Sequence, residues 1–92
     1  MSSKLQLGEL KGTTAALKAL EEANQKPNVL LSRHASGDWG SVSPEQWQKN
    51  NKALETESTV ISKYTLDTGT EIVILTEADR SESLVLLSSE MP

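Results

Sequence analysis

The chain contains no cysteine and a single histidine among its 92 residues. Disulfide bonds, thiolate metal centres and the zinc sites built from histidine and cysteine are therefore excluded. No apolar run approaches the roughly 20 residues that a membrane span requires, and the first residues lead into no signal-like apolar segment. We expect a soluble cytoplasmic protein that holds no metal ion and makes no membrane contact.

Aromatic side chains and positive charge are also scarce. There is no phenylalanine and one tyrosine, so Trp39 and Trp47 must supply most of the aromatic burial. Thirteen acidic and nine basic residues give a net charge of −4. Because nucleic-acid binders usually carry a basic stripe, we expect no direct binding to nucleic acid. Hydrophobic residues make up 36% of the chain, which suffices for one modest core in a single domain spanning residues 1–92.

The first half of the chain has helical periodicity. Apolar residues at three- and four-residue steps, together with local start and stop signals, predict helices over about residues 14–24, 27–36 and 43–55. Pro27 suits the first turn of the second helix, and Gly37 is the residue expected to end it in the left-handed conformation. Ser43 is the expected N-cap of the third helix. Trp47 should face inward there, while Asn50 falls on the face predicted to be polar.

The second half consists of β-branched and aliphatic runs separated by short turns. Together with a weak N-terminal signal, these runs predict strands over about residues 4–10, 59–66, 70–76 and 81–87. Asp67, Thr68 and Gly69 fit a hairpin loop with the glycine in the left-handed position. The predicted fold is α+β: a three- or four-stranded antiparallel sheet, formed by a C-terminal meander and the N-terminal strand, with two or three helices on one face.

The middle strand of this meander is apolar on both sides, with Ile72 and Ile74 on one side. We assign four residues to the opposite side: Val73, Leu75, Val85 and Leu87. A sheet with one solvated face usually alternates more cleanly. The second face is therefore either covered within the chain or in contact with a partner.

Residues Arg33 to Gly40 form the densest group of chemically distinctive side chains. His34 and Asp38 lie four positions apart, the spacing at which a carboxylate can orient a general base. No nucleophile motif accompanies them, and a carboxylate inside the glycine-flanked loop would repel phosphate. We therefore interpret the segment as structural, with glycines that permit sharp turns and Trp39 in the core. The residues assigned to this structural motif are Arg33, His34, Gly37, Trp39, Gly40 and Trp47.

A second group, Thr76 to Arg80, lies between two predicted strands. Glu77 and Asp79 are a carboxylate pair, but the chain offers no phosphate cradle that would accompany a magnesium ion. We interpret them as turn residues and predict that they pair with Arg33, or that Arg80 pairs with Asp38. The two groups should then lie side by side, joined by ion pairs.

Taken together, the motifs Arg33-His34-x-x-Gly37-Asp38-Trp39-Gly40 and Thr76-Glu77-Ala78-Asp79-Arg80 carry a resemblance that extends over the whole length. The chain resembles a family of small proteins encoded on bacterial plasmids, integrative elements and phages. Ser41 stands where that family often has an acidic residue, and Glu82 and Ser83 stand where it is commonly apolar or threonine-rich. The resemblance implies a cytoplasmic protein of the bacterial host that inhibits a defence system, as anti-CRISPR and anti-restriction proteins do.

Such inhibitors occupy a surface of a nuclease or of its targeting ribonucleoprotein complex and need no cofactor or catalysis. The residues expected to bind this partner are Asp38, Glu71, Glu77, Asp79 and Arg80. Their acidic groups can compete with nucleic acid for a basic groove. Two alternatives stay open. One is a small enzyme with a centre built from His34, Asp38, Glu77 and Asp79. The other is a homodimeric accessory protein whose interface is the second sheet face, so the chain is expected to be either a monomer or a homodimer.

Overall fold

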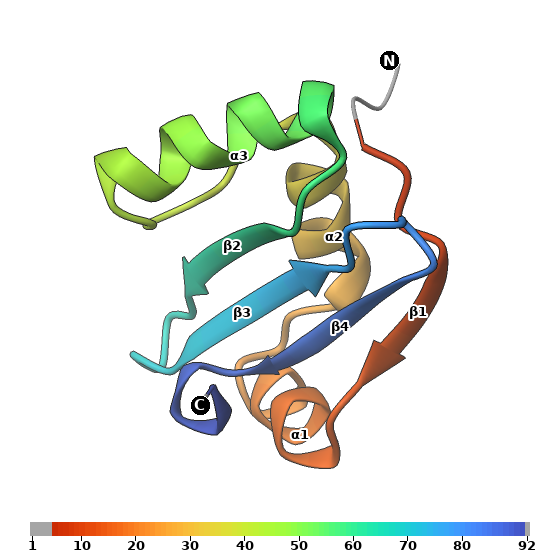
Figure 1. Ribbon diagram of the computed structural model, residues 1–92. Coiled ribbons are helices and arrows are strands. Elements are labelled where there is room, and N and C mark those ends of the chain that lie inside the picture. Colours follow the sequence, from red (N-terminus) through yellow and green to blue (C-terminus); the bar gives the residue numbers. More distant parts are fainter. Residues whose placement is uncertain (1–4, 92) are drawn as a thin grey trace.

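A computed structural model describes residues 5–91 of the chain. Within this range the protein is an α+β domain with three α-helices and one four-stranded sheet (Figure 1). The strands are β1 (Glu9–Gly12), β2 (Val60–Thr65), β3 (Glu71–Thr76) and β4 (Glu82–Leu87). The helices are α1 (Thr14–Glu22), α2 (Pro27–Ser36) and α3 (Pro44–Thr56), and a 3-10 helix, η1 (Ser88–Glu90), follows β4.

The sheet has the order β1-β4-β3-β2. The predicted meander is confirmed, because β2, β3 and β4 pair antiparallel in sequence order. The first strand differs from the prediction of an all-antiparallel sheet, since β1 pairs parallel with β4. It also spans Glu9–Gly12 instead of residues 4–10, and Lys4 lies outside the described residues. A parallel pair needs a long connection between its strands, and here that connection contains all three helices.

Local signals in the sequence account for the helix ends. Thr13 caps α1 by accepting a hydrogen bond from the Ala16 amide at 3.0 Å. Gly37 ends α2 with φ at +93°, as predicted. Ser43 caps α3 by accepting from the Gln46 amide at 3.1 Å. The predicted bounds of α2 are confirmed, and those of the other two helices are correct to within two residues.

The main core lies between the sheet and helices α1 and α2, which pack on the same face (Figure 1). Its buried members are Ala16, Leu20, Leu30, Leu31, Tyr64, Leu66, Ile72, Ile74 and Val85. A second cluster of Leu5, Trp39, Ala53 and Val60 joins α3 to β2 and to the N-terminal segment. Trp47 and Leu54 are partly buried against this second cluster, so the inward orientation predicted for Trp47 is confirmed.

The strand register corrects the residue assignment of the second sheet face. Val85 pairs with Ile74 and Leu87 with Ile72, so both belong to the helix-covered face. Val73 is only 2% exposed, although the core packed under α1 and α2 lies on the opposite side of the sheet. The chain itself returns over this face: η1 lies against β3, and Met91 lines a hollow beside Ile61. The predicted dimer interface of Val73, Leu75, Val85 and Leu87 is therefore not one surface, because a shift of one residue moves a side chain to the other face.

Candidate functional site

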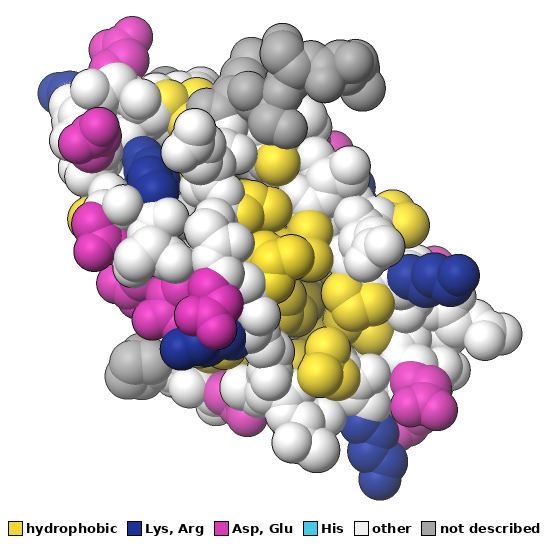
Figure 2. All heavy atoms as spheres, turned by 90° about the vertical axis from the view of Figure 1, so that its right-hand side faces the viewer, with side chains coloured by type: hydrophobic (Ala, Val, Ile, Leu, Met, Phe, Trp, Pro, Cys, Tyr) yellow, Lys and Arg dark blue, Asp and Glu magenta, His cyan; other side chains and the backbone are white. Residues whose placement is uncertain are grey.

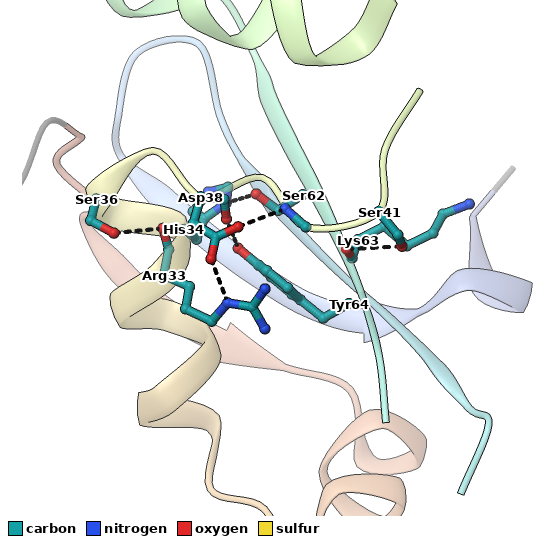
Figure 3. A network of polar contacts seen from close by, with 9 residues as sticks. Arg33, His34, Ser36, Asp38, Ser41, Ser62, Lys63 and Tyr64 are labelled. Atoms are coloured by element: carbon teal, nitrogen blue, oxygen red, sulfur yellow. Dashed lines mark hydrogen bonds and ion pairs between the residues drawn. The ribbon is translucent and has the colours of Figure 1, made fainter. Parts of the chain in front are cut away.

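The segment that follows α2 is held to β2 by the charged residues of the Arg33–Gly40 motif (Figure 3). Arg33 Nε donates to Asp38 Oδ2 at 2.8 Å, and the Gly40 amide donates to Asp38 Oδ1 at 3.2 Å. The Tyr64 hydroxyl donates to the Asp38 carbonyl at 2.7 Å. The Arg33 guanidinium also stacks over the Tyr64 ring, 4.6 Å from its centroid. Arg33, in the last turn of α2, and Asp38, just beyond its end, thus satisfy each other.

These contacts determine the charge states in the loop. The hydrogen bond from Arg33 lowers the pKa of Asp38, and a weaker bond from the Gly40 amide acts in the same direction. Burial raises the pKa of Tyr64 to about 12. At neutral pH, Asp38 is therefore a carboxylate and Tyr64 a neutral hydrogen-bond donor.

Gly40 allows the same segment to cover the outer edge of β2. Its φ is +76°, and a Cβ at this position would overlap the Lys63 carbonyl oxygen and the Tyr64 ring. The Lys63 amide donates to the Trp39 carbonyl at 3.1 Å, and the Ser41 amide donates to the Lys63 carbonyl at 2.7 Å. The loop thereby acts as a short additional strand that satisfies this edge.

Trp39 is fully buried. Its indole Nε1 donates to the Asn51 side chain at 2.9 Å, and its ring meets the His34 ring edge-on, with centroids 5.7 Å apart. The core position predicted for Trp39 is confirmed. Because the indole joins the loop to α3 and to α2, it fixes the relative positions of three parts of the chain.

Asn50 belongs to the face of α3 that was predicted to be polar, but it does not lie at the surface. It is fully buried, its amide donates to the Ile61 carbonyl at 2.7 Å, and its Oδ1 accepts from the Ile61 amide at 3.2 Å. Gln46 donates to the same Oδ1 at 2.9 Å. The asparagine side chain thus makes the two hydrogen bonds to Ile61 that the backbone of a neighbouring strand would make. Together with the 39–41 segment it satisfies the outward backbone groups of Ile61 and Lys63.

His34 is the centre of a buried chain of hydrogen bonds. Its Nδ1 contacts Ser62 Oγ at 2.5 Å and its Nε2 contacts Thr76 Oγ1 at 2.8 Å. Thr76 Oγ1 contacts Ser83 Oγ at 2.7 Å, and Ser83 donates to the Leu7 carbonyl at 2.8 Å. All four side chains are fully buried. The network connects α2 to three strands and to the N-terminal segment.

The last acceptor fixes the direction of the bonds between His34 Nε2 and Leu7. Ser83 has one hydroxyl hydrogen and gives it to the Leu7 carbonyl, so Thr76 must donate to Ser83. The hydrogen of Thr76 is then used, so His34 Nε2 must carry a hydrogen and donate it to Thr76. At neutral pH the lowered pKa leaves the imidazole uncharged, so Nδ1 carries no hydrogen and accepts from Ser62.

Burial lowers the pKa of His34 to about 4, and the positive charge of Arg80 acts in the same direction. The imidazole is 0% exposed, and its ring nitrogens contact hydroxyl groups, so it forms no dyad with Asp38. Ser62 was missed in the sequence, and Thr76 was singled out only as the first residue of the second motif, not as a partner of His34. They lie 28 and 42 positions away, and only their place on inward strand positions could have indicated them.

The β3–β4 turn is stabilised by Arg80, which adopts a φ of +62°. Its guanidinium donates to the Ala53 carbonyl at 2.8 Å and the Ser58 carbonyl at 2.6 Å, at the end of α3. The ion pairs predicted between the two loops, Arg33 with Glu77 or Asp79 and Arg80 with Asp38, are wrong. Across residues 5–91 the ion pairs are Arg33–Asp38 and Lys11–Glu82. The guanidinium of Arg80 is used instead by backbone carbonyls.

The remaining candidate residues are divided between separate places. Glu77 and Asp79 are exposed in the β3–β4 turn, where hydrogen bonds from Ser81 lower the pKa of Asp79. Glu71 is exposed at the opposite end of β3 from this turn. The two predicted loops are joined at their bases through the bond between His34 and Thr76, and not through charged side chains.

Hollows of about 240 to 340 Å³ lie on the described surface, and neither His34 nor Asp38 lines them. One of about 270 Å³ is lined by Leu5, Gln6, Leu54, Glu57 and Arg80. In the part of the chain with assigned positions, no three histidine, aspartate or glutamate side chains are grouped to hold a metal ion. None of the helices within that part is long and apolar enough to cross a membrane.

Comparisons with known proteins identify no relative for this chain: no family model matches it, and neither the curated proteins nor the solved structures include a significant match. The resemblance carried by the Arg33–Gly40 and Thr76–Arg80 motifs therefore stays a prediction.

Proposed function

We propose that this protein acts without catalysis, by binding another protein through the exposed acidic turn between β3 and β4. The target class expected from the motif resemblance is a nuclease of a bacterial defence system or its targeting complex. The chain would inhibit that complex by occupying a basic surface that otherwise receives nucleic acid.

The observation that carries this proposal is the rigid presentation of two carboxylates. Glu77 and Asp79 are exposed, while the backbone beneath them is tied in place. The Arg80 amide donates to the Glu77 carbonyl at 2.9 Å, and the Ser81 amide donates to Asp79 Oδ1 at 3.0 Å. Because Arg80 also bonds the end of α3, the turn is preorganised, which reduces the entropy lost on binding.

The buried state of the other reactive groups favours binding over chemistry. The imidazole of His34 and the hydroxyls of Ser62, Thr76 and Ser83 are fully buried and bonded to one another. A general base must come within hydrogen-bonding distance of its substrate. These side chains lie in the interior, where a substrate of any size would have to displace the core.

Phage plating on strains with an active CRISPR or restriction system tests this proposal. We expect the expressed protein to raise the efficiency of plaquing on at least one such strain. The double variant Glu77→Lys/Asp79→Asn should lower it to the level of cells without the protein, since both acidic groups are lost and the Asn can still accept from Ser81. The variant Glu21→Lys/Glu22→Gln makes the same charge change on the exposed end of α1 and should retain full activity.

Two outcomes contradict the proposal at different levels. If the unaltered protein raises plaquing on none of the strains, inhibition of these defence systems is wrong. If it does so but the turn variant is as active as the α1 variant, the inhibitory surface is not the β3–β4 turn. Thermal melts of both variants separate loss of binding from loss of folding.

A further inference from the structure

The two edge strands of the sheet differ in whether their outward backbone groups are hydrogen-bonded. At the β2 edge, Asn50 and the 39–41 segment satisfy the outward amides and carbonyls of Ile61 and Lys63. At the β1 edge, all four residues of the strand are exposed. An uncovered strand edge is a template for pairing with another strand.

The pairing of β1 with β4 shows which backbone groups are left over. The Glu9 amide donates to the Ser81 carbonyl at 3.0 Å, and the Thr13 amide donates to the Val85 carbonyl at 2.9 Å. In a parallel ladder, alternate residues face the neighbouring strand. Glu9, Lys11 and Thr13 therefore face β4, and the amides and carbonyls of Leu10 and Gly12 point away from the sheet.

An apolar strip accompanies this edge on the helix side of the sheet (Figure 2). Leu10 is 53% and Leu17 is 44% exposed, which makes them two of the three large apolar side chains exposed within residues 5–91. They line one hollow of about 240 Å³ together with Gly12, Pro27, Leu31 and Val85. Leu17 lies directly over the edge, since a Cβ on Gly12 would be 3.1 Å from Leu17 Cδ2.

The charge pattern of β1 identifies the partner. The central Leu10 is flanked by opposite charges, with Glu9 before it and Lys11 after it. An antiparallel neighbour of the same sequence therefore presents these charges in the opposite order. In an antiparallel pair of two such strands centred on Leu10, each Glu9 lies opposite the Lys11 of the other copy, and the two leucines lie opposite each other. Cross-strand pairs of opposite charge and of apolar residues both stabilise a sheet. An isologous two-fold interface requires this kind of self-complementarity.

We propose that β1 is a self-pairing edge, through which two copies of this protein join their sheets about Leu10. The inference does not depend on the proposed function, because Glu77 and Asp79 are not part of the pairing. Lys11 already contacts Glu82 at 2.9 Å, with the two side chains 52% and 35% exposed, so in the dimer it lies between two carboxylates. Because the pairing involves only the four residues of β1 in each copy, we expect it to bury less than the ~1,200 Å² of a stable complex, with a dissociation constant on the order of 0.1 mM.

Sedimentation equilibrium between about 10 µM and about 1 mM covers the range in which such a dimer forms. We expect the average mass to rise toward that of a dimer. The variants Glu9→Lys and Lys11→Glu should each be monomeric, because like charges then lie opposite each other. An equimolar mixture of the two should associate, because a strand with two lysines lies opposite a strand with two glutamates.

Matched controls exchange charges on the exposed side of α1. Glu22→Lys and Lys18→Glu make the same charge changes away from β1 and should leave the dimer unaltered. Hydrogen exchange supplies an independent readout, since the amides of Leu10 and Gly12 should become protected as the concentration rises. A monomer at every concentration refutes the proposal, as does a dimer that persists in both β1 variants or fails to return in their mixture.

Discussion

The buried imidazole of His34 makes the protein sensitive to mild acid. The pKa of this group is lowered from 6.5 to about 4 in the folded state, chiefly by burial. The unfolded chain therefore binds a proton below about pH 6.5 that the folded chain does not bind until about pH 4. The unfolded state binds more protons in this window, so the free energy of unfolding must decrease as the pH falls through it.

The size of the effect follows from the shift. A difference of about 2.5 pKa units corresponds to about 3 kcal/mol over the whole window, of which about 2 kcal/mol is lost between pH 7 and pH 5. A domain of this length has a total stability of about 5–14 kcal/mol, so the loss is readily measured. Carboxylates contribute little to the change in stability between pH 7 and pH 5, and His34 is the only histidine in the chain.

Urea unfolding at pH 7, 6 and 5 measures this loss, and the variant His34→Gln is the control. Glutamine can hydrogen-bond to Ser62 or Thr76 but does not titrate, so the variant should be less stable at pH 7 and nearly constant down to pH 5. NMR titration of the unaltered protein should find the imidazole neutral at pH 5, with its hydrogen on Nε2. A histidine that titrates near pH 6.5, or a stability that does not change between pH 7 and pH 5, would refute the reasoning.

Four further substitutions test the contacts that hold the loops. Trp39→Ala should lower the free energy of unfolding by about 3–5 kcal/mol, because a buried aromatic ring and its cavity are lost; a melting shift of a degree or two would contradict this. Arg80→Gln should cost about 1–3 kcal/mol and speed amide exchange at the end of α3, since the carbonyls of that helix lose a charged donor; unchanged exchange would show that the capping bonds are unimportant. Gly69→Ala should cost about 1–2 kcal/mol in calorimetry for its left-handed backbone, whereas Gly40→Ala should cost clearly more, because its Cβ also overlaps β2. Equal losses for the two glycines would contradict the close packing of Gly40.

Features of the fold that depend on neighbouring residues were predictable. Pro27 and Gly37 mark the two ends of α2, and the structure confirms both. Ser43 caps α3 as expected. These signals act over a few residues, through restricted dihedral angles and through the amides at a helix start that have no partner within the helix. They can therefore be recognised in the sequence. The core position of Trp39 was predictable for a different reason, because the chain has so few aromatic residues to bury.

The candidate site was only partly predictable. The structural interpretation of the Arg33–Gly40 motif rested on side chains that were correctly singled out, but their partners were wrong. Arg33 and Arg80 were expected to bridge the two loops. Arg33 instead pairs with Asp38 of its own motif, and Arg80 bonds backbone carbonyls at the end of α3. Asn50 was assigned to the polar face of α3, and it is buried because the edge of β2 requires a donor and an acceptor there.

The sequence by itself determined the fold class, the three helices, the meander and the core position of Trp39. Only the tertiary structure decided the parallel placement of β1, the register that divides Val73 from Val85, and the hydroxyls that enclose His34. The physical reason is one of range. Capping and periodicity are local, whereas register and buried hydrogen bonds depend on which distant strands meet, and a single-residue shift reverses every side chain.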